Sequence, residues 1–301
     1  MTDTRNNARP ASRWMGLLGA ALVASPGIAH AQALDLFYER TVMSVADERC
    51  RLFTPDVAAA LAAATAQAKG AALRAGAAPD KVKAVERGAR AKAAQADCAS
   101  GDIAVAATRV RSAFAGFSRL TRLSYPGDVA GWRADRSDGR AARWRLMQQA
   151  SFGADRMDFG LAGREGPGAL MAIGRFGDGA VPYAAHLLLR DGSRSAGPYL
   201  DRWNGGATAG LPLSRRLPPR SAVKIYAAEA RSPAGQDLSP KDAGPGWAFR
   251  FPADAAHELA GLDPREAVAV EFLFPGDVAR RAYVEVGDFA AGRAFLTLAE
   301  R

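Results

Sequence analysis

The chain has 301 residues, of which 49% are hydrophobic and 24% are charged, and its formal net charge is +9 at pH 7. These are ordinary values for a globular protein, so they exclude a largely disordered or fibrous chain. Two cysteines and three histidines are too few for a zinc ribbon or an iron–sulfur cluster, and the single short apolar stretch excludes a polytopic membrane protein.

Residues 1–31 have the pattern of a cleaved signal peptide. Three arginines precede an apolar core over residues 15–25, and Ala29-His-Ala31 is a small-x-small cleavage site. The apolar core is shorter than the roughly 20 residues that a membrane-spanning helix needs. We therefore expect a mature chain that begins at Gln32, does not span the membrane, and is periplasmic or secreted.

The net charge bears on the class of partner. Cleavage removes three arginines and one aspartate, which lowers the net charge from +9 to +7. A positive balance favours an anionic envelope component or another envelope protein as partner. The basic residues are spread along the chain, however, so the charge also fits a simple bias in composition. Export removes nucleic acid as a partner, because the protein matures in another compartment.

Residues 32–123 are predicted to form an alanine-rich helical domain. Apolar residues recur every three or four positions from Leu34 to Val45, which indicates a first helix. Thr54-Pro-Asp56 is typical of a helix N-terminus, with a cap residue, proline at the first position and an early acid. A third helix is expected from Asp80 and a fourth after Ser100, which together give a small bundle of three or four helices.

The two cysteines, Cys50 and Cys98, both lie in this helical segment. In an oxidising compartment an even count predicts a disulfide between them. The alternatives are two free buried thiols or a redox pair, although the wide spacing is unlike the C-x-x-C pattern of oxidoreductases. Closing this loop would contribute at most roughly 4 kcal/mol by chain entropy.

The rest of the chain is predicted to be an antiparallel β domain over 143–301, joined to the helices by a solvated linker over 124–142. The linker residues mix turn formers with charge and show no apolar period. From 143 onward apolar residues alternate in short runs between turns, which predicts a sandwich or a barrel-like domain and an α+β fold class. Strands are expected at 143–149, 157–161, 169–175, 184–190, 223–227, 247–251, 268–274, 282–286 and 294–298, with one short helix at 253–259.

The strand pattern of the last third, which closes on Val286-Gly-Asp-Phe289, resembles that of exported invasion-associated B-type proteins of Gram-negative bacteria. The likeness covers the strand rhythm alone, so no residue role is transferred from it.

Few residues are suited to catalysis. After cleavage only His186 and His257 remain as histidines, and the chain has no H-E-x-x-H, no G-x-S-x-G, no P-loop and no dinucleotide-binding glycine motif. The sequence therefore predicts no catalytic residue, no metal ligand and no cofactor.

One loop is a candidate for binding. Arg215, Arg216 and Arg220 surround the rigid Pro218-Pro219 pair, and Trp203 precedes them. Guanidinium groups match carboxylate and phosphate geometry, and an indole stacks on a sugar or a guanidinium. The alternative is a solvated loop between strands with the tryptophan packed beneath it.

These features predict an exported, non-catalytic binding or scaffolding protein of the bacterial cell envelope. The alternative is a hydrolase that acts on an envelope polymer through paired carboxylates. A deep cleft with two facing acids, or His257 beside a carboxylate, would indicate the hydrolase, whereas a shallow face with arginine and aromatic residues would indicate binding. A third possibility is self-association through an apolar stripe that the helical domain leaves uncovered.

Overall fold

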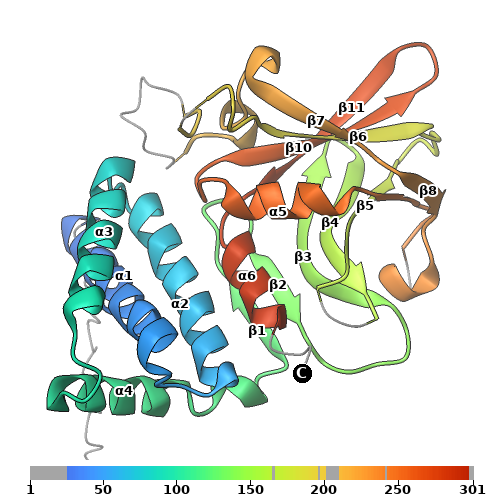
Figure 1. The fold of residues 1–301 in the computed structure, drawn as a ribbon. Helices are drawn as coiled ribbons and strands as arrows, with labels where there is room; N and C mark the ends of the chain where they lie inside the picture. The colour runs from blue at the N-terminus through green and yellow to red at the C-terminus, as the bar shows by residue number, and fades with distance from the viewer. Residues whose placement is uncertain (1–25, 165–166, 196, 201–209, 241–242, 298–301) are drawn as a thin grey trace, which may run out of the picture.

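The structure, a computed structural model, describes residues 26–164, 167–195, 197–200, 210–240 and 243–297. Four N-terminal helices are followed by two antiparallel sheets, so the predicted α+β class is confirmed (Figure 1). In the described residues the sheets have seven and four strands and do not close into a barrel. No helix in these ranges is both long enough and apolar enough to cross a membrane.

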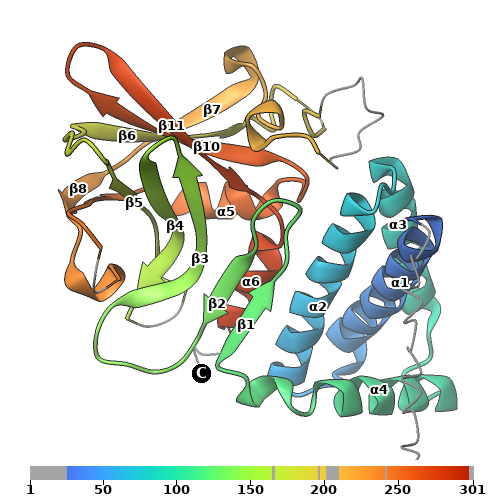
Figure 2. The ribbon, with the colours of Figure 1, turned by 180° about the vertical axis from the view of Figure 1, so that it is seen from behind.

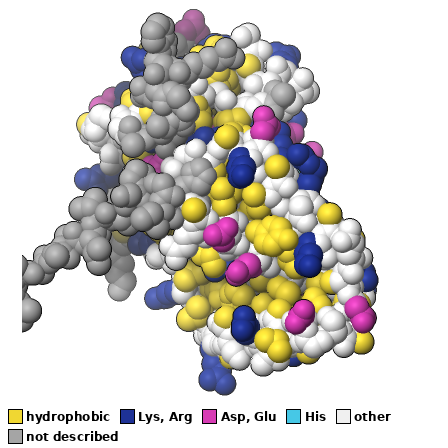
Figure 3. Space-filling model, turned by 90° about the vertical axis from the view of Figure 1, so that its left-hand side faces the viewer, with side chains coloured by type: hydrophobic (Ala, Val, Ile, Leu, Met, Phe, Trp, Pro, Cys, Tyr) yellow, Lys and Arg dark blue, Asp and Glu magenta, His cyan; other side chains and the backbone are white. Residues whose placement is uncertain are grey.

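The helices stand beside the sheets as a separate layer (Figures 1 and 2). They are α1 (Pro26–Cys50), α2 (Pro55–Arg74), α3 (Pro79–Gln95) and α4 (Gly101–Phe114). Helix α1 packs on α2 and α3, and α4 runs across their lower ends (Figure 1). Small side chains such as Ala60, Ala72 and Ala89 are fully buried and allow the helices to approach closely. Figure 3 views the molecule from this helical side.

The helix boundaries follow the sequence signals closely. Helix α2 begins at Pro55, although the Thr54 side chain makes no capping hydrogen bond. At the start of α4 the Ile103 N–H donates to the Ser100 hydroxyl at 3.3 Å, which satisfies one of the first-turn donors. Helix α1 begins at Pro26, ahead of the expected cleavage position, and the signal peptide stays a prediction.

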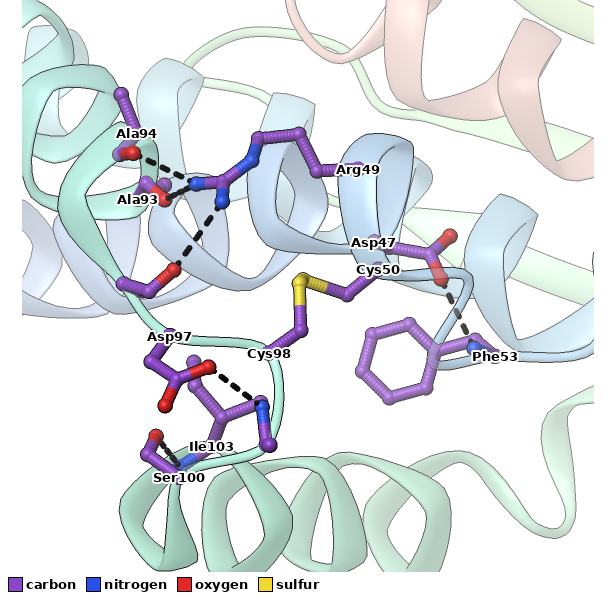
Figure 4. The surroundings of a disulfide bond; sticks show 12 residues. Asp47, Arg49, Cys50, Phe53, Ala93, Ala94, Asp97, Cys98, Ser100 and Ile103 are labelled. Carbon is purple, nitrogen blue, oxygen red and sulfur yellow. Dashed lines mark hydrogen bonds between the residues drawn. A yellow bond between two sulfur atoms is a disulfide. The ribbon is translucent and has the colours of Figure 1, made fainter.

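The predicted disulfide is confirmed. Cys50 at the end of α1 is bonded to Cys98 in the loop between α3 and α4, with a Cα–Cα distance of 5.5 Å (Figure 4). Beside it, the Arg49 guanidinium donates to the carbonyls of Ala93 and Ala94 at 2.6 and 2.7 Å. These carbonyls lie in the last turn of α3, where a cation also meets the negative end of the helix dipole. The two contacts join α1 to α3 at one point.

Replacing both cysteines, Cys50→Ser with Cys98→Ser, is expected to lower the free energy of unfolding by about 2–4 kcal/mol. The unfolded chain regains the freedom of the loop that the disulfide closes. Urea unfolding followed by circular dichroism measures the loss. A reductant should lower the stability of the wild type and leave the double variant unchanged, and equal stability of the two oxidised proteins would contradict the prediction.

The larger sheet has the strand order β1-β2-β3-β4-β5-β9-β8 and the smaller one β11-β10-β6-β7, and neighbouring strands are antiparallel in both. The strands of the larger sheet are β1 (Arg122–Tyr125), β2 (Trp132–Asp135), β3 (Arg143–Phe152), β4 (Asp155–Gly163), β5 (Ala169–Arg175), β8 (Ala230–Pro233) and β9 (Trp247–Arg250). Those of the smaller sheet are β6 (Ala184–Arg190), β7 (Val223–Ala227), β10 (Ala267–Phe274) and β11 (Val278–Glu285). Two helices, α5 (Ala253–Gly261) and α6 (Phe289–Leu296), lie in this region.

The main core lies within this β region, and Phe159, Phe249 and Phe272 are completely buried in it. Phe159 and Phe249 come from the larger sheet and Phe272 from the smaller one. Strands β5, β6 and β7 have the bounds that the sequence predicted.

The expected linker over 124–142 is wrong where β1 and β2 lie. Trp132 and Ala134 are buried at 1% and 2% exposure, whereas Arg133 between them is exposed. Buried and exposed residues thus alternate as in a strand, but over only four residues. The Trp132 indole N–H donates to the carbonyls of Glu285 and Val286 at 3.1 and 3.0 Å. These long-range bonds, which no local pattern shows, hold the segment in the sheet. The division of the chain into separate domains stays a prediction.

The strand expected at 294–298 is also wrong, because α6 occupies most of it. Phe289, Gly292 and Phe295 are buried at a spacing of three residues, which is the period of a helix rather than a strand. In this short stretch the apolar residues fit both periods. Helix α6 packs against α2 and β2 and so lies between the helical layer and the larger sheet.

Candidate functional site

A cleft of about 350 Å³ lies where the helical layer meets the β region. We call it the junction cleft. One wall comes from α2 and α3, and the other comes from the α5–β10 loop and the β11–α6 loop. Ligand sites occur preferentially at such meetings of structural units. Its apolar lining includes Ala66, Leu73, Val82, Leu262, Val286 and Ala291.

Two glycines allow the walls of the junction cleft to meet. Gly287 has a φ of +46° in the turn between β11 and α6, a conformation that favours glycine. This turn directs Asp288 toward α2. There the helix has Gly70, where an added Cβ would lie 2.7 Å from the Asp288 carboxylate. A larger residue at position 70 would push the two walls apart.

The walls are joined by a buried ion pair between α2 and the β11–α6 turn. Arg74 donates from both terminal nitrogens to the two carboxylate oxygens of Asp288, each at 2.9 Å. The side chains are only 12% and 1% exposed. Burial raises the pKa of Asp288, and its bonds to Arg74 only partly offset that rise. Arg74 therefore stabilises the ionised form of Asp288.

The other acidic groups around the junction cleft are also held by arginines. Asp263 receives two bonds from Arg265, each of 2.9 Å. Glu266 accepts from Arg190 at 2.6 Å and from the Asp263 N–H at 3.0 Å. Burial raises the pKa of Glu266, against the opposite effect of Arg190. Each of these carboxylates thus has a guanidinium as a close partner.

Two lysines of the cleft wall are held much less firmly. Lys69 pairs with Glu86 at 3.1 Å and Lys83 with Asp80 at 3.9 Å, and the two lysine side chains are 44% and 62% exposed. Exposed pairs of this kind are worth about 0–1 kcal/mol, so an anionic ligand can replace them at little cost. The junction cleft thus combines an apolar lining with two accessible cations.

The predicted binding loop is not assembled as expected. Arg216 is 1% exposed, and its guanidinium donates to the Leu211 carbonyl at 3.0 Å and to Asp128 at 3.2 Å. It follows a 3-10 turn over Leu213–Arg215 and is directed into the protein, and the binding role of the loop stays a prediction.

The other residues of that loop differ in their surroundings. Arg215 is exposed, and Arg220 is largely exposed and donates to Glu271 at 3.2 Å. Trp203 lies outside the described residues. The described arginines thus do not form one guanidinium cluster on the surface, because Arg216 is directed inward.

Neither histidine is hydrogen-bonded to a carboxylate of the described residues. His257 is exposed on α5 and makes no hydrogen bond to a described carboxylate, while its neighbour Glu258 pairs with Lys224. His186 is half-buried on β6, opposite Glu271 in the sheet register. In the described ranges no group of three or more His, Cys, Asp or Glu side chains is arranged to hold a metal ion.

The sequence reasoning missed Lys69, Lys83 and Asp288 as site residues. Asp288 lies more than two hundred positions from the two lysines, so no local pattern links it to them. Two signals were present: the only glycine within the alanine-rich helix, Gly70, and the Gly287-Asp288 pair just after a strand. Each glycine indicates that another part of the chain approaches the backbone closely at that position. Neither indicates which segment that is.

Comparisons with protein-family models, with curated proteins and with solved structures found no match. The resemblance of the strand pattern to the invasion-associated B-type proteins therefore stays a prediction, and the function is inferred from the site alone.

Proposed function

We propose that this is an exported, non-catalytic binding protein of the bacterial cell envelope, and that the junction cleft holds its ligand. The ligand that fits has an anionic group and an apolar body. One observation carries the proposal. The acids around the cleft are paired with arginines, whereas Lys69 and Lys83 are only weakly paired and can meet an anionic group.

The apolar part of the ligand would lie on the hydrophobic lining of the cleft. A volume of about 350 Å³ is in the range of small-molecule sites, which are mostly apolar with a few placed polar groups. Burial there contributes about 25 cal/mol for each Å² of apolar surface. A carboxylate, phosphate or sulfonate at the other end of the ligand would meet Lys69 and Lys83, which suits an acidic amphiphile of the envelope.

The same contacts favour binding over the hydrolase alternative. Polymer cleavage by two carboxylates needs one to act as an acid and the other as a base or nucleophile. In the junction cleft Asp288 and Asp263 each receive two hydrogen bonds from an arginine. Those bonds engage both oxygens of each carboxylate and leave fewer acceptor positions for a substrate or a water.

The fluorescent probe anilinonaphthalene sulfonate, which joins a sulfonate to an apolar body, tests the proposal. The variant Lys69→Glu with Lys83→Glu is expected to bind it at least tenfold more weakly, a loss of about 1.4 kcal/mol or more. The matched control is Lys81→Glu with Arg87→Glu, which makes the same change of charge at exposed positions of α3 outside the cleft. The control is expected to bind as the wild type does.

Two results would overturn the proposal. One is equal affinity of the probe for the cleft variant and for the control. The other is release of soluble fragments from purified peptidoglycan by the wild type and not by an Asp288→Asn variant that remains folded, because the carboxylates would then be catalytic.

A further inference from the structure

A second hollow, of about 490 Å³, lies on the helical side of the molecule. We call it the α1–α4 groove. It shares no lining residue with the junction cleft. Figure 3 shows hydrophobic side chains gathered over the lower part of this side, with acidic and basic side chains around them. The apolar lining includes Leu36, Val42, Met43, Leu61, Val110 and Phe114.

Two apolar residues of the lining are exposed to solvent, whereas Met43 and Leu61 are buried. Leu36 and Tyr38 on α1 are 39% and 37% exposed, and Val105 nearby in sequence on α4 is 54% exposed. Single exposed apolar residues are normal, but several grouped in a hollow mark an interaction surface. The groove therefore has the character of a contact face.

The charges of the groove are divided between its walls. Glu39 lies on the α1 wall, whereas Lys92 and Arg109 come from α3 and α4. These three side chains form no ion pair with any described residue. Arg40 differs, because its guanidinium donates to the Ala64 carbonyl at 2.8 Å and is engaged within the bundle. The α1 wall thus presents an acid without an ion-pair partner among the described residues, beside the engaged Arg40, and the opposite walls are basic.

We propose that a second copy of this chain occupies the α1–α4 groove in a two-fold arrangement. In such a contact the same surface is used twice, so it must be complementary to itself. The α1 of each copy would lie against the α4 of the other, which places Glu39 opposite Arg109 of the partner subunit. An unrelated helix that carries one sign of charge would form ion pairs with only one wall of the groove. A second copy would form ion pairs with both walls. This inference does not depend on the proposed function.

Sedimentation velocity on the protein exported from the full coding sequence tests the dimer. The wild type is expected to dimerise at micromolar concentration. Glu39→Arg and Arg109→Glu, each alone, are expected to weaken the dimer at least tenfold, because both contacts become repulsive. An equimolar mixture of the two variants is expected to dimerise again, because both contacts of the mixed pair are then attractive.

The controls are Glu48→Arg and Arg87→Glu, which change the same charges at exposed positions outside the groove and are expected to dimerise as the wild type does. Circular dichroism checks that every variant is folded. A wild type that stays monomeric at all concentrations would overturn the proposal. So would a dimer that both groove variants leave intact, or two monomeric variants that do not recombine.

Discussion

The substitution Glu285→Ala is expected to lower the free energy of unfolding by about 4 kcal/mol. Glu285 is completely buried at the end of β11. Its carboxylate accepts the backbone N–H groups of Asp128, Val129 and Ala130 at 2.8, 2.7 and 3.0 Å. These three bonds hold the turn between β1 and β2, so their loss removes an anchor that joins segments more than one hundred and fifty residues apart.

The size of the effect follows from the count of donors. A hydrogen bond to a charged group contributes about 1.5–3 kcal/mol, and part is regained because the released turn meets water. Glu285→Gln keeps one acceptor oxygen and is expected to cost about half as much. Urea unfolding at neutral pH measures both losses. Two results would contradict this account of the turn. One is a Glu285→Ala protein that is as stable as the wild type. The other is an equal loss of stability for Glu285→Ala and Glu285→Gln.

The substitution Arg74→Met is expected to cost about 3–5 kcal/mol at pH 7, because it leaves the buried Asp288 carboxylate without its cation. The loss should shrink as the pH falls. Burial already raises the pKa of Asp288, and removal of Arg74 raises it further. A carboxyl with a higher pKa in the folded protein holds its proton more tightly there, so folding loses stability as the pH rises through this range.

Urea unfolding of wild type and variant between pH 7 and about pH 4 measures this dependence. The double variant Arg74→Met with Asp288→Asn removes the buried charge altogether. It is expected to regain part of the stability at pH 7 and to lose stability less steeply with rising pH than Arg74→Met does. A cost for Arg74→Met that is constant over this pH range would show that Asp288 does not need Arg74.

The sequence predicted those parts of the fold that depend on the order of apolar and polar residues within one short segment. Strand β7, over Val223–Ala227, alternates Val223, Ile225 and Ala227 with Lys224 and Tyr226 and so shows a strand period. The Cys50–Cys98 disulfide followed from a count of two and from the expected compartment. The α6 segment was misread because a few apolar residues at a chain end fit both a strand and a helix.

The candidate site was not predictable in the same way. Asp288 acquires its role from Arg74, 214 positions away, and its approach depends on Gly70. Arg216 was assigned to the surface because arginines in a proline-rich loop are usually exposed, yet Asp128 from the β1–β2 turn pairs with it inside the protein. Contacts of this kind appear only when the helices and sheets are placed together.

The central claim is that the junction cleft binds an anionic, partly apolar ligand. Two-dimensional amide NMR spectra recorded during titration with anilinonaphthalene sulfonate test it most directly, because glycine amides lie in a separate part of the spectrum. We expect the signals of Gly70, Gly261 and Gly287, all in the cleft lining, to shift together with one affinity. Unchanged glycine signals, with the shifts confined to Leu36 and Val110 in the α1–α4 groove, would contradict the claim.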